Sequence, residues 1–213
     1  MASFDPSCYE QCLCALLDGD AATRTRGEQF LAAAEQTRLS ELLAALCAVL
    51  ERAAAAPSVR QLACIVLKNL VKAHWDAASK RYAPPLIALD ARAPVRRAVL
   101  HALGAADSKL RTAAATTLCE ILCWDWPAAW PTAVADLVRC TQDSSPRLVR
   151  GALAALDQFL ATADIPDVST ATRTRSGVCR CTGRMLMHLP SSGSRKSAIS
   201  PFITSGRIAT ATP

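Results

Sequence analysis

The chain has 213 residues, of which 51% are hydrophobic but only 5% are aromatic. Alanine and leucine supply most of the apolar surface and favour closely packed helices, whereas β-branched residues are too sparse to build a sheet. The net charge of +6 is uneven, because residues 1–168 hold 17 basic and 18 acidic residues while residues 169–213 hold seven basic and no acidic ones. An all-α body is therefore predicted, and its near-neutral charge argues against a nucleic-acid-binding core.

The N-terminus and the apolar runs give no sign of targeting or membrane insertion. The first ten residues carry no basic side chain, so neither a secretory nor a mitochondrial presequence is visible. The longest clean apolar run, residues 42–50, is far too short to span a bilayer. Most of the ten cysteines sit among apolar residues at helical spacing, which favours a reducing compartment. Core positions are expected for Cys47, Cys64, Cys119 and Cys140.

Apolar residues recur at helical spacing in eight segments of the chain. In chain order these segments cover residues 8–17, 21–35, 39–53, 57–75, 94–103, 108–124, 133–141 and 146–160. Ser58 and Gln61 are expected to form a capping box at the start of the fourth helix. Pro94 is expected to start the fifth helix, and Ser145 followed by Pro146 is a good start for the eighth.

Neighbouring segments pair into four helix–turn–helix units of about 35 to 50 residues each, a period typical of HEAT and armadillo-type arrays. A unit of this kind cannot bury its apolar face alone, so neighbouring units stack into a superhelix with a concave surface. The predicted fold is an all-α, HEAT-type helical-repeat solenoid of about four helix pairs. An ordinary globular helical bundle has the same apolar patterning and stays open as the alternative.

Enzymatic and metal chemistry find little support in the sequence. His74, His101 and His188 lie in no local catalytic signature, and the scattered glycines form no phosphate-binding loop. Cys119 and Cys123 share a helix face by their spacing, but a zinc site needs a second matched pair. We therefore expect no enzymatic activity, no metal and no cofactor.

Three stretches resemble the N-terminal domain of the importin-β (karyopherin-β) superfamily of nuclear transport receptors. The first is RQLACIVLKNLVKAHW at 60–75, the second is SKLRTAAATTLCEI at 108–121, and the most specific is WDWPAAWP at 124–131. The resemblance covers about residues 16–160. The motif residues are Arg60, Leu62, Ala63, Trp75, Trp124, Asp125, Trp126, Pro127, Trp130 and Pro131. Most of them are expected to pack, with the indoles filling the joint between two repeats and the prolines ending one helix and starting the next.

The resemblance also implies a partner surface. In importin-β receptors the second helices of the first repeats line the inner surface and contact the GTPase Ran in its GTP form. Residues left pointing outward on these helices are the candidates for that contact, although a solvated helix face would have the same appearance. The Ran-binding candidates are Gln61, Lys68, Asn69, Lys72, Lys109 and Arg111.

The function implied by the resemblance is that of a nuclear import receptor fragment, which moves between cytoplasm and nucleus and reaches the nuclear envelope and pore. Implied partners are Ran-GTP, basic import cargoes such as histones or ribosomal proteins, and nucleoporins in the full-length receptor, with no nucleic acid and no membrane insertion. A Ran-independent HEAT-repeat scaffold or adaptor, or an export receptor of the same superfamily, stays open as the alternative.

The helical pattern ends near residue 168, which divides the chain into repeats at 1–168 and a basic tail at 169–213. The tail is rich in Ser, Thr, Arg and Gly, and its composition predicts disorder. Because the family would continue with further repeats, we expect a change of reading frame or splicing near residues 173–177. A genuine short isoform with a functional tail is the rival interpretation.

Overall fold

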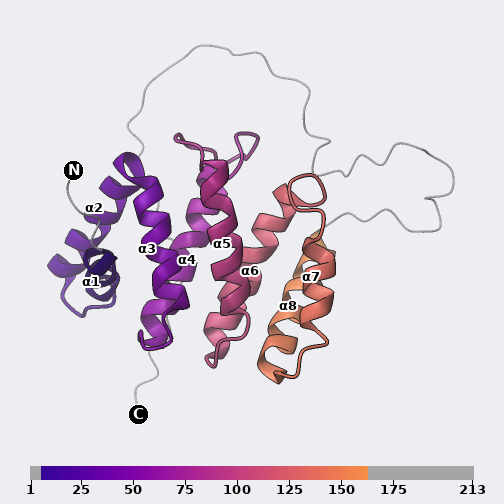
Figure 1. Ribbon diagram of the computed structural model, residues 1–213. Coiled ribbons are helices and arrows are strands. Elements are labelled where there is room, and N and C mark those ends of the chain that lie inside the picture. Colours follow the sequence, from indigo (N-terminus) through magenta and orange to yellow (C-terminus); the bar gives the residue numbers. More distant parts are fainter. Residues whose placement is uncertain (1–5, 163–213) are drawn as a thin grey trace, which may run out of the picture.

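The computed structural model describes residues 6–162, and these residues contain helices and connecting turns without a strand (Figure 1). The helices are α1 (Pro6–Leu16), α2 (Ala21–Thr37), α3 (Leu39–Glu51), α4 (Pro57–His74), α5 (Leu89–Ala102), α6 (Ser108–Asp125), α7 (Ala133–Cys140) and α8 (Pro146–Thr162). The all-α prediction is confirmed for this part of the chain. The tail predicted at 169–213 lies outside the described residues.

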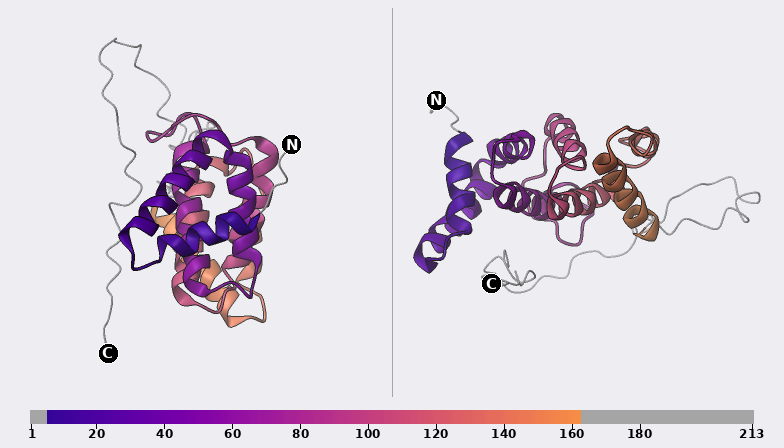
Figure 2. Two further views of the ribbon diagram at one scale, coloured as in Figure 1. Left: turned by 90° about the vertical axis from the view of Figure 1, so that its left-hand side faces the viewer. Right: turned by 90° about the horizontal axis from the view of Figure 1, so that it is seen from below.

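The helices are arranged as four consecutive pairs, in which each odd-numbered helix packs against the even-numbered helix that follows it. Figure 2 shows two layers, with α3, α5 and α7 in one and α4, α6 and α8 in the other. Helix α4 packs on α6 and α6 on α8, while α3 packs on α5. The first pair is turned against the others, so that α1 lies against both α3 and α4. This stacking of successive pairs confirms the predicted helical-repeat solenoid and excludes a closed bundle for the described residues.

One apolar core runs through all the pairs and holds the stack together. It is built mostly from leucine, alanine and valine, with Leu42 and Leu46 of α3, Leu67 of α4 and Leu118 of α6 fully buried. Each such side chain contributes about 1.5–3 kcal/mol when it leaves water. Among the described helices, none is both long and apolar enough to cross a membrane.

Three local predictions are wrong. Pro94 does not start the fifth helix. Helix α5 begins at Leu89, directly after its N-cap residue Ala88, and carries Pro94 in its interior. The capping box predicted for Ser58 and Gln61 does not form. Helix α4 begins one residue earlier, at Pro57, and its N-cap residue makes no side-chain hydrogen bond. Proline at the first position fixes the helical φ without a cap. Cys140 is half-buried rather than a core residue, because it lies at the exposed end of α7.

Helix α8 approaches its neighbours unusually closely at one glycine. A Cβ atom placed on Gly151 would lie 2.3 Å from the backbone oxygen of Leu103, at the end of α5. No real Cβ atom tolerates such a distance from backbone, so this position requires glycine for the fourth pair to dock on the third.

Candidate functional site: the face of the second helices

A polar strip runs along the solvent side of α4. Two of its members are adjacent in sequence and the others lie three, four and seven residues from them, which places all of them on the side of the helix away from the core. They are the predicted residues Gln61, Lys68, Asn69 and Lys72, and all four are partly exposed. Within the described part of the chain, Gln61, Lys68 and Asn69 make no side-chain hydrogen bond, so their polar groups face water.

Lys72 is tied to the neighbouring repeat. Its Nζ lies 2.6 Å from Oε1 of Glu120 on α6, and both side chains are about a quarter to a third exposed to water. An ion pair in this setting contributes about 0–1 kcal/mol of stability, so Lys72 remains available to exchange its partner. The pair marks the line along which α4 and α6 lie side by side.

The other two predicted residues lie at the beginning of α6 and differ in their freedom. Lys109 is exposed. Arg111 is not free, because its Nη1 donates to the backbone oxygens of Ala105 and Ala106, both at 2.8 Å. These bonds stabilise the α5–α6 turn. Lys109 therefore belongs to the open polar surface, whereas the guanidinium of Arg111 already holds the turn.

The first sequence motif packs α4 against α3. Arg60 donates from Nε and Nη2 to the backbone oxygen of Leu50, at 3.1 and 2.6 Å, and so satisfies a carbonyl at the end of α3. Ala63 is buried, and Leu62 packs against the edge of the core. Trp75, at the end of the motif, is completely buried. These side chains set the position of α4 and leave its opposite face to solvent.

Asp125 is a buried acid at the centre of the joint between the second and third pairs. It is 1% exposed and accepts a hydrogen bond from Nε1 of Trp75 at 2.9 Å. Arg96 of α5 binds the same carboxylate through Nε at 2.9 Å and Nη2 at 2.7 Å. Nη1 of Arg92 lies 3.7 Å away. The charge is thus compensated by two arginines, which is the condition for burying a carboxylate.

The two arginines also stack on tryptophans. The guanidinium of Arg92 lies 5.0 Å from the Trp75 ring and donates to the backbone oxygen of Trp75, and that of Arg96 lies 5.2 Å from the Trp130 ring. Each cation–π contact contributes about 0.5–2 kcal/mol. The joint therefore combines charge pairing with aromatic packing.

The rest of the tryptophan–proline motif lies between α6 and α7. Trp126 meets Phe159 of α8 edge to face, with ring centroids 5.7 Å apart. Trp124 is half-buried in the last turns of α6, whereas Pro127 and Pro131 are exposed in the connection to α7. The indoles thus fill spaces between helices, and the prolines occupy the turn outside them.

A second buried polar cluster ties α2 to α4. His74 is fully buried, and its Nε2 lies 2.8 Å from Oε1 of Glu35. Its Nδ1 lies 2.7 and 2.9 Å from the backbone oxygens of Ala83 and Pro85. When Glu35 is ionised all three partners are acceptors, and a ring that carries a proton on each nitrogen donates to all of them. Burial lowers the pKa of His74, but the hydrogen bonds and charge of Glu35 and the two carbonyls outweigh it and raise the pKa above its usual value.

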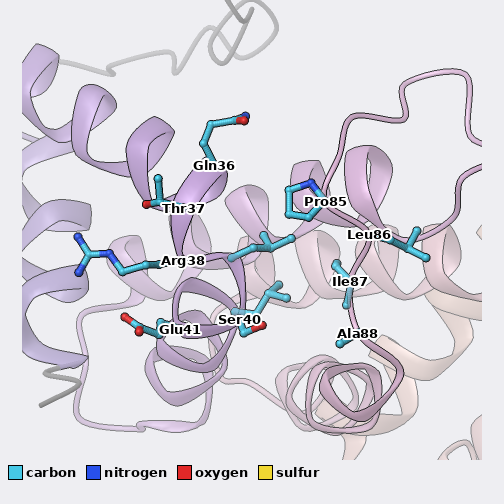
Figure 3. Close-up of a pocket in the computed structure, with 11 residues that line it drawn as sticks. Gln36, Thr37, Arg38, Ser40, Glu41, Pro85, Leu86, Ile87 and Ala88 are labelled. Atoms are coloured by element: carbon cyan, nitrogen blue, oxygen red, sulfur yellow. The ribbon is translucent and has the colours of Figure 1, made fainter. Parts of the chain in front are cut away.

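A groove that shares Pro85 with this cluster lies between the α2–α3 corner and the segment that leads into α5 (Figure 3). Its volume is about 360 Å³. Gln36, Thr37 and Arg38 form one side, and Pro85 and Ile87 form the other. Among residues 6–162 no three His, Cys, Asp or Glu side chains gather to hold a metal ion. The groove offers mixed polar and apolar walls and no such ligand set.

Sequence reasoning missed Arg92, Arg96, Glu35 and Glu120. The spacing of Arg92 and Arg96 was the available signal, since residues four apart share a helix face. Two arginines on one face of a helix that packs into the core need an anion, and Asp125 is the acid of the most specific motif. Nothing local in the sequence connects Glu35 to His74 or Glu120 to Lys72.

Comparison with known proteins gives a family match for the centre of the chain. Residues 27–105 match the family described as the importin-beta N-terminal domain. The matched segment begins inside α2 and ends in the α5–α6 turn. It therefore includes the whole of α4 and its polar strip.

Solved structures resemble the described helices over a longer span. A crystal structure of importin beta is 26% identical with a TM-score of 0.61, and the match covers 74% of this chain and 19% of that chain. Yeast importin-beta (Kap95p) is 22% identical with a TM-score of 0.61, and the match covers 73% of this chain and 19% of that chain. The exportin Cse1 is 18% identical with a TM-score of 0.60, and the match covers 74% of this chain and 16% of that chain. Below 25% identity such likeness concerns the fold alone.

The chain spans about a fifth of the length of the importin-β structures that it matches, which the 19% coverage states directly. The structural likeness to importin beta covers 74% of the chain, a longer span than the family match at residues 27–105. Residues 27–105 are thus similar in sequence, and the described helices similar in fold, to the N-terminal repeats of the karyopherin-β superfamily.

Proposed function

We propose that this chain forms the N-terminal repeats of a nuclear transport receptor and binds Ran in its GTP form through the solvent face of α4 and the start of α6. Binding, without catalysis, is the whole of this activity. The observation that carries the proposal is the polar strip of α4, which is exposed and lies inside the segment that matches the importin-beta N-terminal domain. The residues proposed to contact Ran are Gln61, Lys68, Asn69, Lys72 and Lys109, with Arg111 supporting the turn beside them.

The similar structures support this choice of partner. In one of them, Kap95p binding induces the switch loops of RanGDP to adopt the GTP-bound conformation. Another is a Kap95:Nup1 complex. Both relatives are 22% identical to this chain. A receptor that pulls Ran towards its GTP-bound conformation binds that conformation more tightly, because a ligand shifts an equilibrium only by its differential affinity.

The finer assignment is to an import receptor that resembles importin-9. The resemblance lies in the Trp-Asp-Trp-Pro run at 124–127, the His-Trp pair at 74–75 and the Pro-Pro pair at 84–85. For a full-length receptor of this kind we propose basic cargoes such as histones or ribosomal proteins, contacts with nucleoporins, and movement between cytoplasm and nucleus. Release of cargo on binding Ran would be a coupling free energy between two sites.

The test is a binding titration of the full chain against Ran loaded with a non-hydrolysable GTP analogue or with GDP. We expect tighter binding of the GTP form. Reversal of two charges on the strip, Lys68→Glu with Lys72→Glu, should weaken binding about tenfold or more, since close charge pairs at interfaces contribute over 1.4 kcal/mol. Glu120→Ala, which releases Lys72 from its ion pair, should leave binding unchanged or strengthen it.

The matched control reverses two exposed basic residues on the loop between α4 and α5. Lys80→Glu with Arg81→Glu changes the net charge by the same amount at another place. If both double variants weaken binding equally, only the overall charge matters and the proposed surface is wrong. If the chain is helical by circular dichroism yet binds neither form of Ran, a Ran-independent scaffold is the better description.

A further inference from the structure

Two thiols meet at the junction of α6 and α8. Cys119 and Cys123 lie one turn apart on α6, so their side chains project from the same face. Sγ of Cys119 lies 3.4 Å from Oγ1 of Thr162, and Sγ of Cys123 lies 3.9 Å from the same hydroxyl. Three polar side chains from two helices thus converge on one point. Cys119 is buried, and Cys123 is partly exposed and gives access from solvent.

The surroundings favour the thiolate of Cys119. A hydrogen bond from Cys123 lowers the pKa of Cys119 to about 7, against the opposing effect of burial, and Thr162 adds a second hydrogen bond. Glu120 raises this pKa and Lys72 lowers it, so the two members of the charged pair beside the site act on the thiol in opposite directions.

The chain contains a second cysteine pair with the same spacing and different surroundings. Cys8 and Cys12 also lie four residues apart, on α1. Sγ of Cys12 donates to the backbone oxygen of Gly27 at 3.2 Å, and burial raises the pKa of Cys12 to about 11. The Cys12 sulfur is therefore committed to α2 and stays protonated. This pair serves as an internal control for the effect of spacing alone.

The geometry narrows the chemistry at Cys119 and Cys123. Cβ atoms four residues apart on a helix are about 5–6 Å apart, whereas a disulfide needs them at about 3.5–4.5 Å. The pair therefore stays reduced while α6 is intact. Tetrahedral zinc needs four ligands, and among the described residues no third His, Cys, Asp or Glu joins the two thiols. Two thiolates alone suit a soft ion of low coordination number.

We propose that Cys119 and Cys123 form a two-thiolate binding site for a soft monovalent cation, of which Cu(I) is the type. Binding replaces the thiol protons with the metal: one Cu⁺ and two thiols give a bis-thiolate copper anion and two protons. No electron is transferred. Lys72 lies close enough to affect the charge of Cys119 and would compensate that of the complex. Apart from Lys72, which also belongs to the surface proposed for Ran, this site shares no residue with that surface, and its two thiol ligands are not needed for the proposed binding of Ran.

The test measures how fast each cysteine of the full chain is alkylated, read out by mass spectrometry of the separate peptides. Iodoacetamide is added anaerobically with and without Cu(I), whose free concentration is held constant by a chelator, so that other cysteines cannot deplete it. We expect Cys119 and Cys123 to be protected together by about tenfold or more, and Cys8 and Cys12 to be unaffected. The wild-type pattern alone decides between these outcomes and needs no variant.

Two variants sharpen the test. Cys123→Ser should remove the protection of Cys119, because a single thiolate no longer chelates the ion, whereas Cys8→Ser should leave it unchanged. Circular dichroism checks that both variants keep their helices. The proposal is overturned if Cys119 and Cys123 are alkylated at the metal-free rate, if the Cys8–Cys12 pair is protected equally, or if protection of Cys119 persists in Cys123→Ser.

Discussion

Removal of the Asp125 carboxylate should lower the stability of the protein, because it disrupts the joint between the second and third helix pairs. Asp125→Ala leaves Nε1 of the fully buried Trp75 without an acceptor, at a cost of about 1–3 kcal/mol. It also leaves Arg96, only 18% exposed in its side chain, without its partner. Breaking a buried ion pair by removing one partner costs about 3–5 kcal/mol. The two costs overlap because both groups share one carboxylate, and water reaches part of Arg96, so we expect a loss of about 3–4 kcal/mol in total, near the lower end of these ranges.

The assay is thermal and urea unfolding followed by circular dichroism. A loss of this size lowers Tm by roughly 10 °C for a domain of this length. Asp125→Asn should fall between the wild type and Asp125→Ala, because the amide oxygen still accepts from Trp75 but carries no charge. Asp157→Ala, on the exposed face of α8, is the matched control and should change stability by less than about 0.5 kcal/mol. If Asp125→Ala and Asp157→Ala are equally stable, the buried network does not hold the repeats together.

Two further predictions concern other contacts between helix pairs. Gly151→Ala should destabilise the protein by about 1–3 kcal/mol in urea unfolding, despite the higher helix propensity of alanine, because its Cβ would collide with the Leu103 backbone. Gly19→Ala, with open space around its Cβ, should be nearly neutral, and equal effects at the two glycines would refute the close approach. The pKa of His74 is raised by folding, so its contribution to stability is complete below the unfolded pKa of about 6.5 and is lost as pH rises through the higher folded pKa. The difference in unfolding free energy between wild type and His74→Gln should therefore shrink with rising pH. A difference that stays constant with pH would contradict a protonated ring. The matched control is His101→Gln, at an exposed histidine.

The order and type of the helices could be predicted from the sequence because each helix carries a strong apolar stripe. Seven of the eight predicted segments begin within a few residues of the observed helices. The fifth predicted segment is too short, because proline is a start signal at the first helical position and Pro94 lies five residues after the start of α5. A proline in the first turn of a helix removes no hydrogen bond, since the first four N–H groups have no partner inside the helix. Pro94 lies just beyond the first turn of α5, so few hydrogen bonds are lost. Local signals therefore place helices better than they place helix ends.

The polar strip of α4 could also be predicted, since a helix with one buried face leaves the other to water. The partners of its members could not. Lys72 pairs with Glu120, 48 positions later, and Asp125 binds Trp75, directly after α4, and Arg96 of α5. Such contacts depend on how one repeat stacks on the next, and this arrangement has no periodic trace in the sequence. Arg111 illustrates the same point, because the hydrogen bonds to the turn take up a side chain that the sequence leaves outward.

The measurement that tests the central claim most directly is a lysine footprint of the full chain with and without Ran loaded with a GTP analogue. The chain has lysines on the proposed surface, at Lys68, Lys72 and Lys109, and elsewhere, at Lys80 and Lys196. Binding through the face of α4 and the start of α6 predicts that the first three become protected from acetylation while Lys80 keeps its rate. Acetylation of Lys68, Lys72 and Lys109 at unchanged rates under saturating Ran, or equal protection of Lys80, would contradict it.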